Sequence, residues 1–490
     1  MANHISVKAL MQESGVAFGT SGARGLVSAM TDRVCYGYTT GFLGHLVAQG
    51  QWRPDGKVAL AGDLRPSTPR ILAACSAAVR AMGAEPVFCG FVPTPALAFF
   101  AMGEAMPAIM VTGSHIPDDR NGIKFYRPTG EILKDDEPGI LGQIVPDGPW
   151  DHAGSLIDVP ILPQPLDIQS PYVSRYLDAF GPTALQGLRV GVYQHSAVGR
   201  DVLMEILASL GASTIALGRS ERFVPVDTEA IRPEDAALAR QWAGTHQLDA
   251  IVSTDGDSDR PLLADAKGEW LRGDVLATLC ATALGMQTVV TPVSSNTLVE
   301  QCGLFHRVER TRIGSPYVIR AMQTALTNGE QMVCGYEANG GFLLGSDFVR
   351  GDAVLRALPT RDAVLPIIAV LTAARSATVR SLVDALPKRV TYSDRLTDFP
   401  PDRRDFLMSW MLEGPDRGAR LETVFGPLAQ AGLRSVDLTD GVRMVFANDR
   451  VIHLRGSGNA PELRCYVEAD EHEVARAIAI STLEIVMQRK

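Results

Sequence analysis

The sequence predicts three similar α/β domains followed by a dissimilar α+β domain, and three observations carry this prediction. Apolar runs of strand length alternate with helix-length amphipathic stretches through the first three quarters of the chain. This alternation starts afresh near residues 188 and 273. The last hundred residues contain short strand-like runs separated by turns and one terminal helix. Repeated βαβ units favour mixed, mostly parallel sheets, whereas the final segment favours a C-terminal α+β domain.

The individual elements follow in chain order. The first series predicts strands at 57–61, 85–89 and 108–111 and a helix at 68–82. The second predicts strands at 188–193, 213–217 and 249–253 and a helix at 198–210. The third predicts a helix at 273–284 and strands at 288–291 and 331–334. The last predicts strands at 442–446, 451–454 and 463–468 and a helix at 471–487.

Changes in composition suggest where the domains end. Residues 145–165 are rich in Pro, Gly and Asp, and further breaks lie near 267–272 and 387–389. A chain of 490 residues has room for three or four domains at roughly 100–200 residues each. We expect four domains, at 1–155, 156–268, 269–387 and 388–490.

Composition excludes several classes of protein. Hydrophobic residues make up 46% of the chain, charged residues 21%, and the net charge is −9, with no long basic run to favour nucleic acid as a partner. The apolar stretch 363–374 is shorter than the roughly 18 residues that cross a membrane, so we expect a core helix there. The N-terminus lacks the pattern of a signal peptide. Seven scattered cysteines without a CxxC pair favour reduced thiols in the cytoplasm over a disulfide framework or a zinc site.

The stretch TGSHIPDDRNGIKFY, residues 112–126, places Ser114 directly after an apolar run. A nucleophilic serine needs an exposed hydroxyl, cationic neighbours and a proton acceptor, and His115 and Lys124 are candidates for the neighbouring groups. An ordinary serine in a turn before a proline is the alternative. The motif alone does not decide between them.

The stretch STDGDSDRPLL, residues 253–263, follows a predicted strand and carries Asp255, Asp257 and Asp259 at alternate positions. Three carboxylates in one tight loop suit a hard cation, Mg²⁺ or Ca²⁺. A helix–loop–helix calcium site is excluded, because Arg260 replaces the required glycine and Ala266 the required glutamate. A solvated acidic turn remains the alternative.

Three further loops have the composition of ligand-binding sites. The loop 18–27 combines three glycines and small hydroxyl residues with Arg24, which suits an anion. The loop 334–344 offers Glu337 and Asn339 beside glycines, which suits sugar hydroxyls. The loop 453–469 suits a phosphate group, with the candidates Arg455, Ser457, Gly458, Asn459 and Arg464. A plain glycine turn or hairpin is the alternative for each of them.

The combination of these loops is more specific than any one of them. A candidate serine nucleophile, a hard-metal loop, a hydroxyl-binding loop and a phosphate-binding loop imply phosphoryl transfer on a sugar phosphate. No Walker loop or kinase signature supplies a nucleotide. The combination therefore favours a mutase, which exchanges one phosphate ester for another, over a kinase.

The chain resembles the α-D-phosphohexomutase family, the phosphomannomutase/phosphoglucomutase type, from about residue 18 to residue 468. The resemblance rests on the TxSHxP…NGxK, DGDxDR and RxSG…P loops, which occur in the order of the family. It implies four domains around a central active-site cleft. It also implies a serine that is phosphorylated in the active enzyme, a Mg²⁺ cofactor and a hexose 1,6-bisphosphate as intermediate and activator.

Roles are carried over motif by motif. Ser114 resembles the phosphorylated serine, and the metal ligands implied are Ser114, Asp255, Asp257 and Asp259. The other catalytic residues implied are Arg24, His115, Lys124 and Arg260. Substrate contacts are implied for Arg312, Gly314, Ser315, Glu337, Asn339, Arg455, Ser457, Gly458, Asn459 and Arg464.

The chain departs from the family pattern at several positions. Ile116 stands where the family usually has Asn, and Ser258 where it has Gly. Asn459 and Ala460 replace Thr-Glu. Histidines that many relatives have near Ser315 and Gly341 are absent, which favours Lys124 with Arg24 as acid/base groups over an imidazole.

The function expected is reversible conversion of mannose 6-phosphate and mannose 1-phosphate. Alternatives are phosphoglucomutase or phosphoglucosamine mutase, a metal-dependent phosphatase, and a non-catalytic sugar-phosphate-binding protein on the same fold. The partners expected are small hexose phosphates, with no nucleic acid and no membrane, and the oligomeric state is left open between monomer and homodimer.

Overall fold

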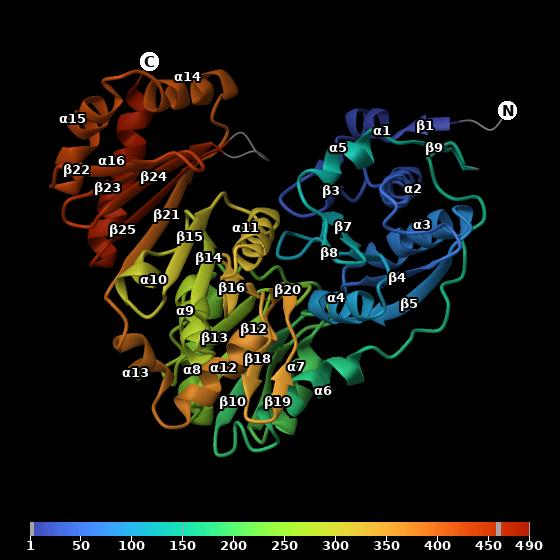
Figure 1. Ribbon diagram of the computed structural model, residues 1–490, viewed down its shortest axis with the longest axis horizontal. Coiled ribbons are helices and arrows are strands. Elements are labelled where there is room, and N and C mark those ends of the chain that lie inside the picture. The colour runs from blue at the N-terminus through green and yellow to red at the C-terminus, as the bar shows by residue number, and fades with distance from the viewer. Residues whose placement is uncertain (1–3, 149, 457–461, 490) are drawn as a thin grey trace. The chain divides into compact units, whose positions relative to one another are not determined.

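The structure is a computed structural model that describes residues 4–148, 150–456 and 462–489. The chain forms two compact units. The first unit contains Met1–Met286 and Gly314–Val383, and the second contains Gln287–Ile313 and Asp384–Lys490. Figure 1 colours their elements by position along the chain.

The first unit begins with a mixed sheet whose strand order is β2-β3-β7-β6-β4-β5, with β8 paired to β7. Its strands are β2 (Ala17–Phe18), β3 (Ala23–Leu26), β4 (Lys57–Gly62), β5 (Glu85–Phe91), β6 (Ala108–Val111), β7 (Arg120–Arg127) and β8 (Gly130–Glu131). A separate antiparallel pair is formed by β1 (His4–Ser6) and β9 (Ile144–Pro146). The helices here are α1 (Val7–Ser14), α2 (Asp32–Ala48), α3 (Thr68–Ala81), α4 (Thr94–Gly103) and α5 (Asp136–Leu141).

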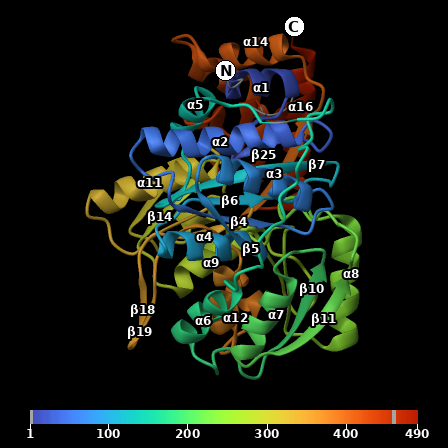
Figure 2. The same cartoon turned by 90° about the vertical axis from the view of Figure 1, so that its right-hand side faces the viewer.

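Two apolar layers enclose this sheet because successive strand residues point to opposite faces. Leu60 and Ile109 pack in the core cluster that contains α2 and α3. Their neighbours Ala59 and Met110 pack in the cluster that contains α4. Figure 2 shows α2 and α3 on one side of β4 and β6 and α4 on the other. These two layers fix the carboxyl ends of β4 and β6. The loops that follow these two strands contribute residues to the candidate site.

A second sheet in the same unit has the strand order β11-β10-β12-β13. Strands β10 (Arg189–His195), β11 (Ser213–Arg219) and β12 (Ala250–Thr254) are parallel, and β13 (Pro261–Ala264) pairs antiparallel with β12. The helices are α6 (Gln169–Phe180), α7 (Arg200–Ser209) and α8 (Pro233–His246). The turn between β12 and β13 is the predicted metal loop.

The remaining elements of the first unit follow residue 272. Strands β16 (Val333–Tyr336), β17 (Phe342–Leu344) and β20 (Leu358–Asp362) are joined by antiparallel pairing. The hairpin β18 (Phe348–Arg350) and β19 (Ala353–Leu355) stands apart from them as its own sheet. The helices are α9 (Gly273–Ala283), α11 (Ser315–Thr327), α12 (Val364–Ala374) and α13 (Val379–Asp384). Helix α12 is buried along its length, so the prediction of a core helix is confirmed.

The second unit contains a parallel strand pair and an antiparallel sheet. The pair is β14 (Thr288–Pro292) and β15 (Arg307–Thr311), with α10 (Leu298–Gln301) between them. The sheet, in the order β21-β25-β24-β23-β22, has the strands β21 (Val390–Leu396), β22 (Leu433–Asp437), β23 (Val442–Phe446), β24 (Val451–Gly456) and β25 (Leu463–Ala469). Its apolar face packs against the helices α14 (Pro401–Leu412), α15 (Arg417–Ala429) and α16 (His472–Gln488).

The fold class is therefore the predicted one, α/β domains followed by an α+β domain. Each strand and helix predicted from periodicity is present, with ends displaced by up to two residues. None of the helices in the described ranges has the length and hydropathy needed to cross a bilayer.

Candidate active site

Ser114 follows β6 and is fully buried. Its hydroxyl donates a hydrogen bond to Oδ2 of Asp255 over 2.6 Å. The sequence predicted an exposed hydroxyl, and that prediction is wrong because the metal loop covers the serine. The structure instead brings together the two motifs that are 141 residues apart.

The backbone of Ser114 lies in the left-handed region, with φ 56°. A residue with a side chain adopts this conformation only where its surroundings fix it, and such positions cluster at functional sites. Here the N–H of Ser114 donates to Oγ1 of Thr112 over 2.8 Å. Its carbonyl accepts from Arg65 over 2.8 Å. The serine is thus held by its main chain, and its hydroxyl is left to face the metal loop.

Arg65 was not predicted from the sequence, although it organises the serine loop. Its guanidinium donates over 2.5–3.1 Å to four carbonyl oxygens, those of Ser114, Ile116, Pro117 and Arg120. Asp63 accepts from its Nε over 3.1 Å. Ile116 contributes to this clamp through its backbone, so the departure from the family pattern at that side chain leaves the contact intact.

The three aspartates of the metal loop are buried and converge. One carboxylate oxygen from each of Asp255, Asp257 and Asp259 lies within 4.8 Å of the others. In the described part of the chain, Oδ1 of Asp257 and Oδ1 of Asp259 have no hydrogen-bond partner. Burial and the two neighbouring carboxylates raise the pKa of Asp255 well above its usual range. Unpartnered buried carboxylate oxygens fit a hard divalent cation, so this cluster could hold a metal ion.

Lys124 lies on β7, in a strand and not in the loop that the sequence suggested. Its Nζ donates to Oδ2 of Asp257 and to Oδ2 of Asp259, each over 2.6 Å. Burial opposes ionisation of Asp257, yet the Lys124 ammonium holds the pKa of that carboxyl below its usual range. The lysine is thus fixed against the carboxylate cluster.

His115 is a hydrogen-bond acceptor and not a cation. Its Nδ1 lies 2.9 Å from NH1 of Arg260, which can only donate, so this ring nitrogen carries no proton. Burial, with Arg260 and Arg24, also holds the pKa of His115 far below its usual range. The same nitrogen lies 3.3 Å from Oγ of Ser114. Of the two candidates beside Ser114, His115 is therefore a neutral acceptor and Lys124 is the group that pairs with carboxylates.

Arg24 lies on β3 and, among the described residues, makes no hydrogen bond through its side chain. Burial and the neighbouring cations Arg260 and Arg361 lower the pKa of Arg24 to about 10. It is therefore a buried cation close to two other cations, with the carboxylates of Asp257 and Asp259 as the nearby opposite charges. Such a group favours an incoming anion.

The sugar loop is linked to the metal loop through Arg361, a second residue that the sequence did not reveal. Glu337 accepts a hydrogen bond from NH1 of Arg361 over 3.0 Å. Asn339 fixes the turn, because its Oδ1 accepts from the N–H of Gly341 over 2.9 Å. Ser315, which begins α11 after Gly314, donates to Oε1 of buried Glu131 over 3.1 Å.

The remaining candidates lie in the second unit. Arg312 donates to the carbonyl of Thr439 over 3.1 Å. Arg455 pairs with Asp440 over 2.8 Å, and Arg464 pairs with Glu462 over 3.0 Å. The candidates Ser457, Gly458 and Asn459 lie outside the described residues.

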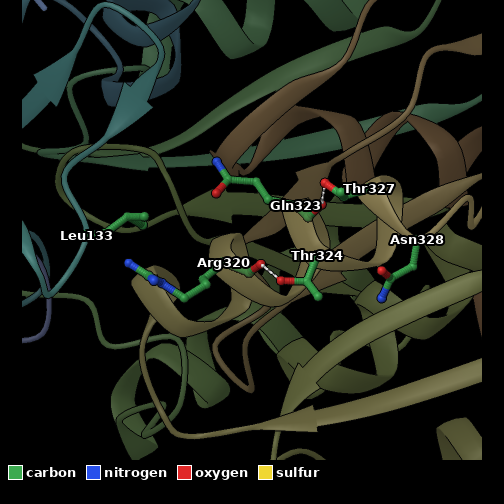
Figure 3. Close-up of a pocket in the computed structure, with 6 residues that line it drawn as sticks. All are labelled: Leu133, Arg320, Gln323, Thr324, Thr327 and Asn328. Atoms are coloured by element: carbon green, nitrogen blue, oxygen red, sulfur yellow. Dashed lines mark hydrogen bonds between the residues drawn. The ribbon is translucent and has the colours of Figure 1, made fainter.

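A separate pocket of about 340 Å³ lies along one face of α11. Figure 3 shows its lining, which is Leu133, Arg320, Gln323, Thr324, Thr327 and Asn328. It contains none of the predicted site residues. Its α11 side chains are exposed.

Comparison with known proteins identifies the family of the chain. The four domain profiles of the phosphoglucomutase/phosphomannomutase family match the chain: alpha/beta/alpha domain I at residues 15–146, domain II at 171–268, domain III at 272–390 and the C-terminal domain at 412–484. The chain belongs to the phosphoglucomutase/phosphomannomutase family. It is therefore an enzyme of the phosphohexomutase class.

Individual relatives support the same class. A phosphomannomutase of Salmonella muenchen is 44% identical, over 100% of this chain and 99% of its own. A phosphomannomutase of Sinorhizobium fredii is 42% identical, over 96% of this chain and 100% of its own. A crystal structure from Thermus thermophilus, assigned as a phosphomannomutase, shares the fold with a TM-score of 0.74 at 22% identity, over 96% of this chain and 99% of its own.

Proposed function

We propose that the protein interconverts mannose 6-phosphate and mannose 1-phosphate through a phosphorylated Ser114 and a hexose 1,6-bisphosphate. The observation that carries the proposal is the 2.6 Å contact between Oγ of Ser114 and Asp255. A phosphoryl group on that oxygen would lie beside a cluster of three carboxylates and Lys124. A divalent cation held by those carboxylates, together with the ammonium of Lys124, would offset the charge on a transferring phosphoryl.

Mg²⁺ is the metal that we assign to the cluster. Asp255, Asp257 and Asp259 would hold it, together with one oxygen of phosphorylated Ser114. When bound, it supplies positive charge that offsets the charge on the phosphoryl oxygens. The unpartnered Oδ1 atoms of Asp257 and Asp259 support the assignment.

The chain's own groups take the remaining parts of the transfer. The bond from phosphorus to Oγ of Ser114 breaks as a bond to the free hexose hydroxyl forms. The hydroxyl loses one proton and Ser114 gains one, so each half-reaction is neutral in protons. We assign the transfer of this proton to Arg24, whose pKa is lowered to about 10, together with Lys124. Arg260 faces the transferring group, and His115 orients its guanidinium.

Substrate recognition is assigned to the candidate loops of each unit. Glu337 and Asn339 would bind adjacent hydroxyls, with Gly314 and Ser315 lining the same loop region. The distal phosphate is assigned to residues of the second unit that offer basic or hydroxyl side chains or backbone amides, namely Arg312, Arg455, Ser457, Gly458, Asn459 and Arg464. A generic phosphate site is appropriate there because the bisphosphate must bind in two orientations before Ser114 takes back a phosphoryl group.

The mannose preference follows the phosphomannomutases of Salmonella muenchen and Sinorhizobium fredii, and glucose or glucosamine phosphates are the alternatives. We further propose domain boundaries at 1–155, 156–268, 269–387 and 388–490. The seven unpaired cysteines support a cytoplasmic protein. For the oligomeric state we propose a monomer or a homodimer.

The test combines turnover with intact mass. We expect a fraction of the purified protein to be about 80 Da heavier, the mass of one phosphoryl group, with the modification at Ser114. With a trace of hexose bisphosphate, kcat/KM for mannose 1-phosphate should exceed that for glucose 1-phosphate. Ser114→Ala should lower turnover at least about a thousandfold, or about 4 kcal/mol in activation free energy.

Wild-type turnover in Ser114→Ala would rule out the phosphoserine route. Release of inorganic phosphate without isomerisation would instead indicate a phosphatase. Unmodified protein without turnover would indicate a binding protein.

A further inference from the structure

One buried guanidinium contacts three loops of the site. Arg361 donates from Nε to Oδ2 of Asp259 over 3.0 Å and from NH1 to Oε2 of Glu337 over 3.0 Å. Its NH1 also lies 3.4 Å from Oγ of Ser315. A proposed metal ligand, a candidate sugar ligand and the first residue of α11 therefore share one cation.

The surrounding strands fix the position of this cation. Arg361 lies near the end of β20, and the next residue, Asp362, accepts hydrogen bonds from Tyr172 and Tyr176 over 3.1 and 2.5 Å. Its aliphatic stem packs on Gly341, where a Cβ atom would lie 2.8 Å away. Glycine at this position therefore gives the arginine room to reach both carboxylates.

The charges around Arg361 explain why it stays in place. Its side chain is only 2% exposed and is therefore enclosed by protein. It contacts Asp259, a proposed ligand of the metal, and Glu337, a proposed ligand of the substrate. Burial disfavours the guanidinium, but Asp259, Glu131 and Glu337 more than compensate and raise the pKa of Arg361. Planar guanidinium groups suit such bridging because their donors have fixed directions.

We propose that Arg361 is a positioning residue that sets the spacing between the metal loop and the sugar loop. It acts through Asp259 and Glu337, in the way that side chains behind metal ligands orient those ligands. The inference rests on the proposed function, because it assigns the substrate hydroxyls to Glu337. Two consequences follow from the contacts.

The first consequence concerns the substrate. Without Arg361, Glu337 loses its cationic partner, so the sugar loop is no longer held at its present distance from the metal loop.

The second consequence concerns binding of Mg²⁺. Removing one positive charge 3.0 Å from Asp259 leaves the carboxylate cluster more negative, so Mg²⁺ should bind as tightly as before or more tightly. Loss of the fold would weaken both kinds of binding together.

The test uses the full-length chain and the variants Arg361→Met, Arg361→Lys, Glu337→Gln and the Met/Gln double variant. The KM for mannose 1-phosphate should rise at least tenfold in Arg361→Met and in Glu337→Gln. The double variant should be no worse than the worse single variant, because both act on one contact. Arg361→Lys should recover part of the loss, because lysine keeps the charge but lacks the two separate donor nitrogens that reach Asp259 and Glu337. Calorimetric titration with Mg²⁺ should give an unchanged or smaller Kd for Arg361→Met.

A matched control is Arg320→Met, which removes an exposed arginine of α11 that pairs with Asp135 at the pocket shown in Figure 3. It should leave KM, kcat and the Mg²⁺ titration unchanged. If Arg361→Met does not fold, Gly341→Ala displaces the arginine stem while keeping the charge, and it should raise KM in the same direction.

An unchanged KM in Arg361→Met and Gly341→Ala, or multiplying effects of Arg361→Met and Glu337→Gln, would overturn the inference. A Mg²⁺ Kd raised in step with a lower unfolding temperature would also overturn it, because that pattern indicates a structural role. Absence of mutase turnover in the wild type would instead contradict the proposed function.

Discussion

Single buried arginines organise this site more than the reactive groups themselves do. Arg65 pairs with Asp63 and supplies the donors for four carbonyl oxygens of the serine loop. The loop has no regular hydrogen-bond ladder of its own between β6 and β7, and its carbonyls would otherwise be poorly satisfied. The left-handed backbone of Ser114 is thus maintained from outside the loop.

Arg65→Met should therefore lower stability and activity together. Removing one partner of a buried, hydrogen-bonded ion pair leaves Asp63 without its cation, although Thr68 and Thr112 still donate to it. The expected cost is about 3–5 kcal/mol in the free energy of unfolding. Turnover should fall at least tenfold because Ser114 is no longer fixed. Urea unfolding and steady-state kinetics measure the two effects.

The control for this prediction is Arg356→Met, which removes an arginine that is 76% exposed and pairs with Asp347. An exposed ion pair contributes up to about 1 kcal/mol, so this variant should resemble the wild type. Equal unfolding free energies for the Arg65 and Arg356 variants would contradict the role of Arg65.

The reactive side chains could be predicted from the sequence, whereas the supporting ones could not. Ser114, Lys124 and the three aspartates stand in short motifs whose residue types alone indicate chemistry. Arg361 and Asp259 are 102 residues apart, and Arg65 and Ser114 are 49 apart, so only the fold brings each pair together. The residues next to Arg65 and Arg361 in the sequence do not indicate which side chains these arginines contact. The burial of Ser114 was missed for the same reason, since a distant loop covers it.

Among the secondary structure elements, the strands with clear apolar patterns were predictable, including the antiparallel strands β23, β24 and β25, whereas β7 was not. Strands β4, β6 and β12 are continuous apolar runs because both of their faces are covered. Strand β7 is buried too, but it carries Lys124 toward the metal loop and Asn121 toward Ser67 and Thr68, and these polar residues hide its strand pattern. Functional side chains thus obscure the elements that position them.

The contact between the metal loop and the serine loop leaves no room for a side chain at Gly256. A Cβ atom there would lie 2.6 Å from the carbonyl oxygen of Ser114. Gly256→Ala should therefore push the two loops apart and lower kcat at least tenfold, while the sheets that carry the loops remain folded. Kinetics and circular dichroism together measure this outcome.

Gly244→Ala is the matched control, because Gly244 lies inside α8 with open space around the position of a Cβ atom. It should raise stability by about 0.5–1 kcal/mol through helix propensity and leave kcat unchanged. Wild-type kcat in Gly256→Ala would show that the loops do not need their present separation.

For the molecule as a whole, the two compact units imply that unfolding has more than one stage. Each unit contains a buried histidine, His195 in the first and His453 in the second, whose pKa burial lowers to about 4. Nε2 of His453 donates to the carbonyl of Asp440 over 2.6 Å, and Nδ1 is buried without a hydrogen-bond partner among the described residues. Burial therefore outweighs the Asp440 contact and keeps the ring neutral at neutral pH. The ring also stacks on Tyr466 within the antiparallel sheet.

Acid should therefore destabilise the second unit before its carboxylates titrate. The imidazole of His453 has a pKa of about 4 in the folded state and about 6.5 when unfolded. Between these values the unfolded chain binds the proton, so the contribution of His453 is complete above about pH 6.5 and is lost as the pH falls toward 4. From pH 7.5 to 5 the loss is about 2 kcal/mol.

Hydrogen exchange in β23 and β24 should accelerate accordingly, beyond the chemical effect of pH. His453→Gln keeps a donor for Asp440 and cannot titrate, so its local stability should stay level over this range. An equal acid response in the variant and the wild type would exclude His453 as the cause.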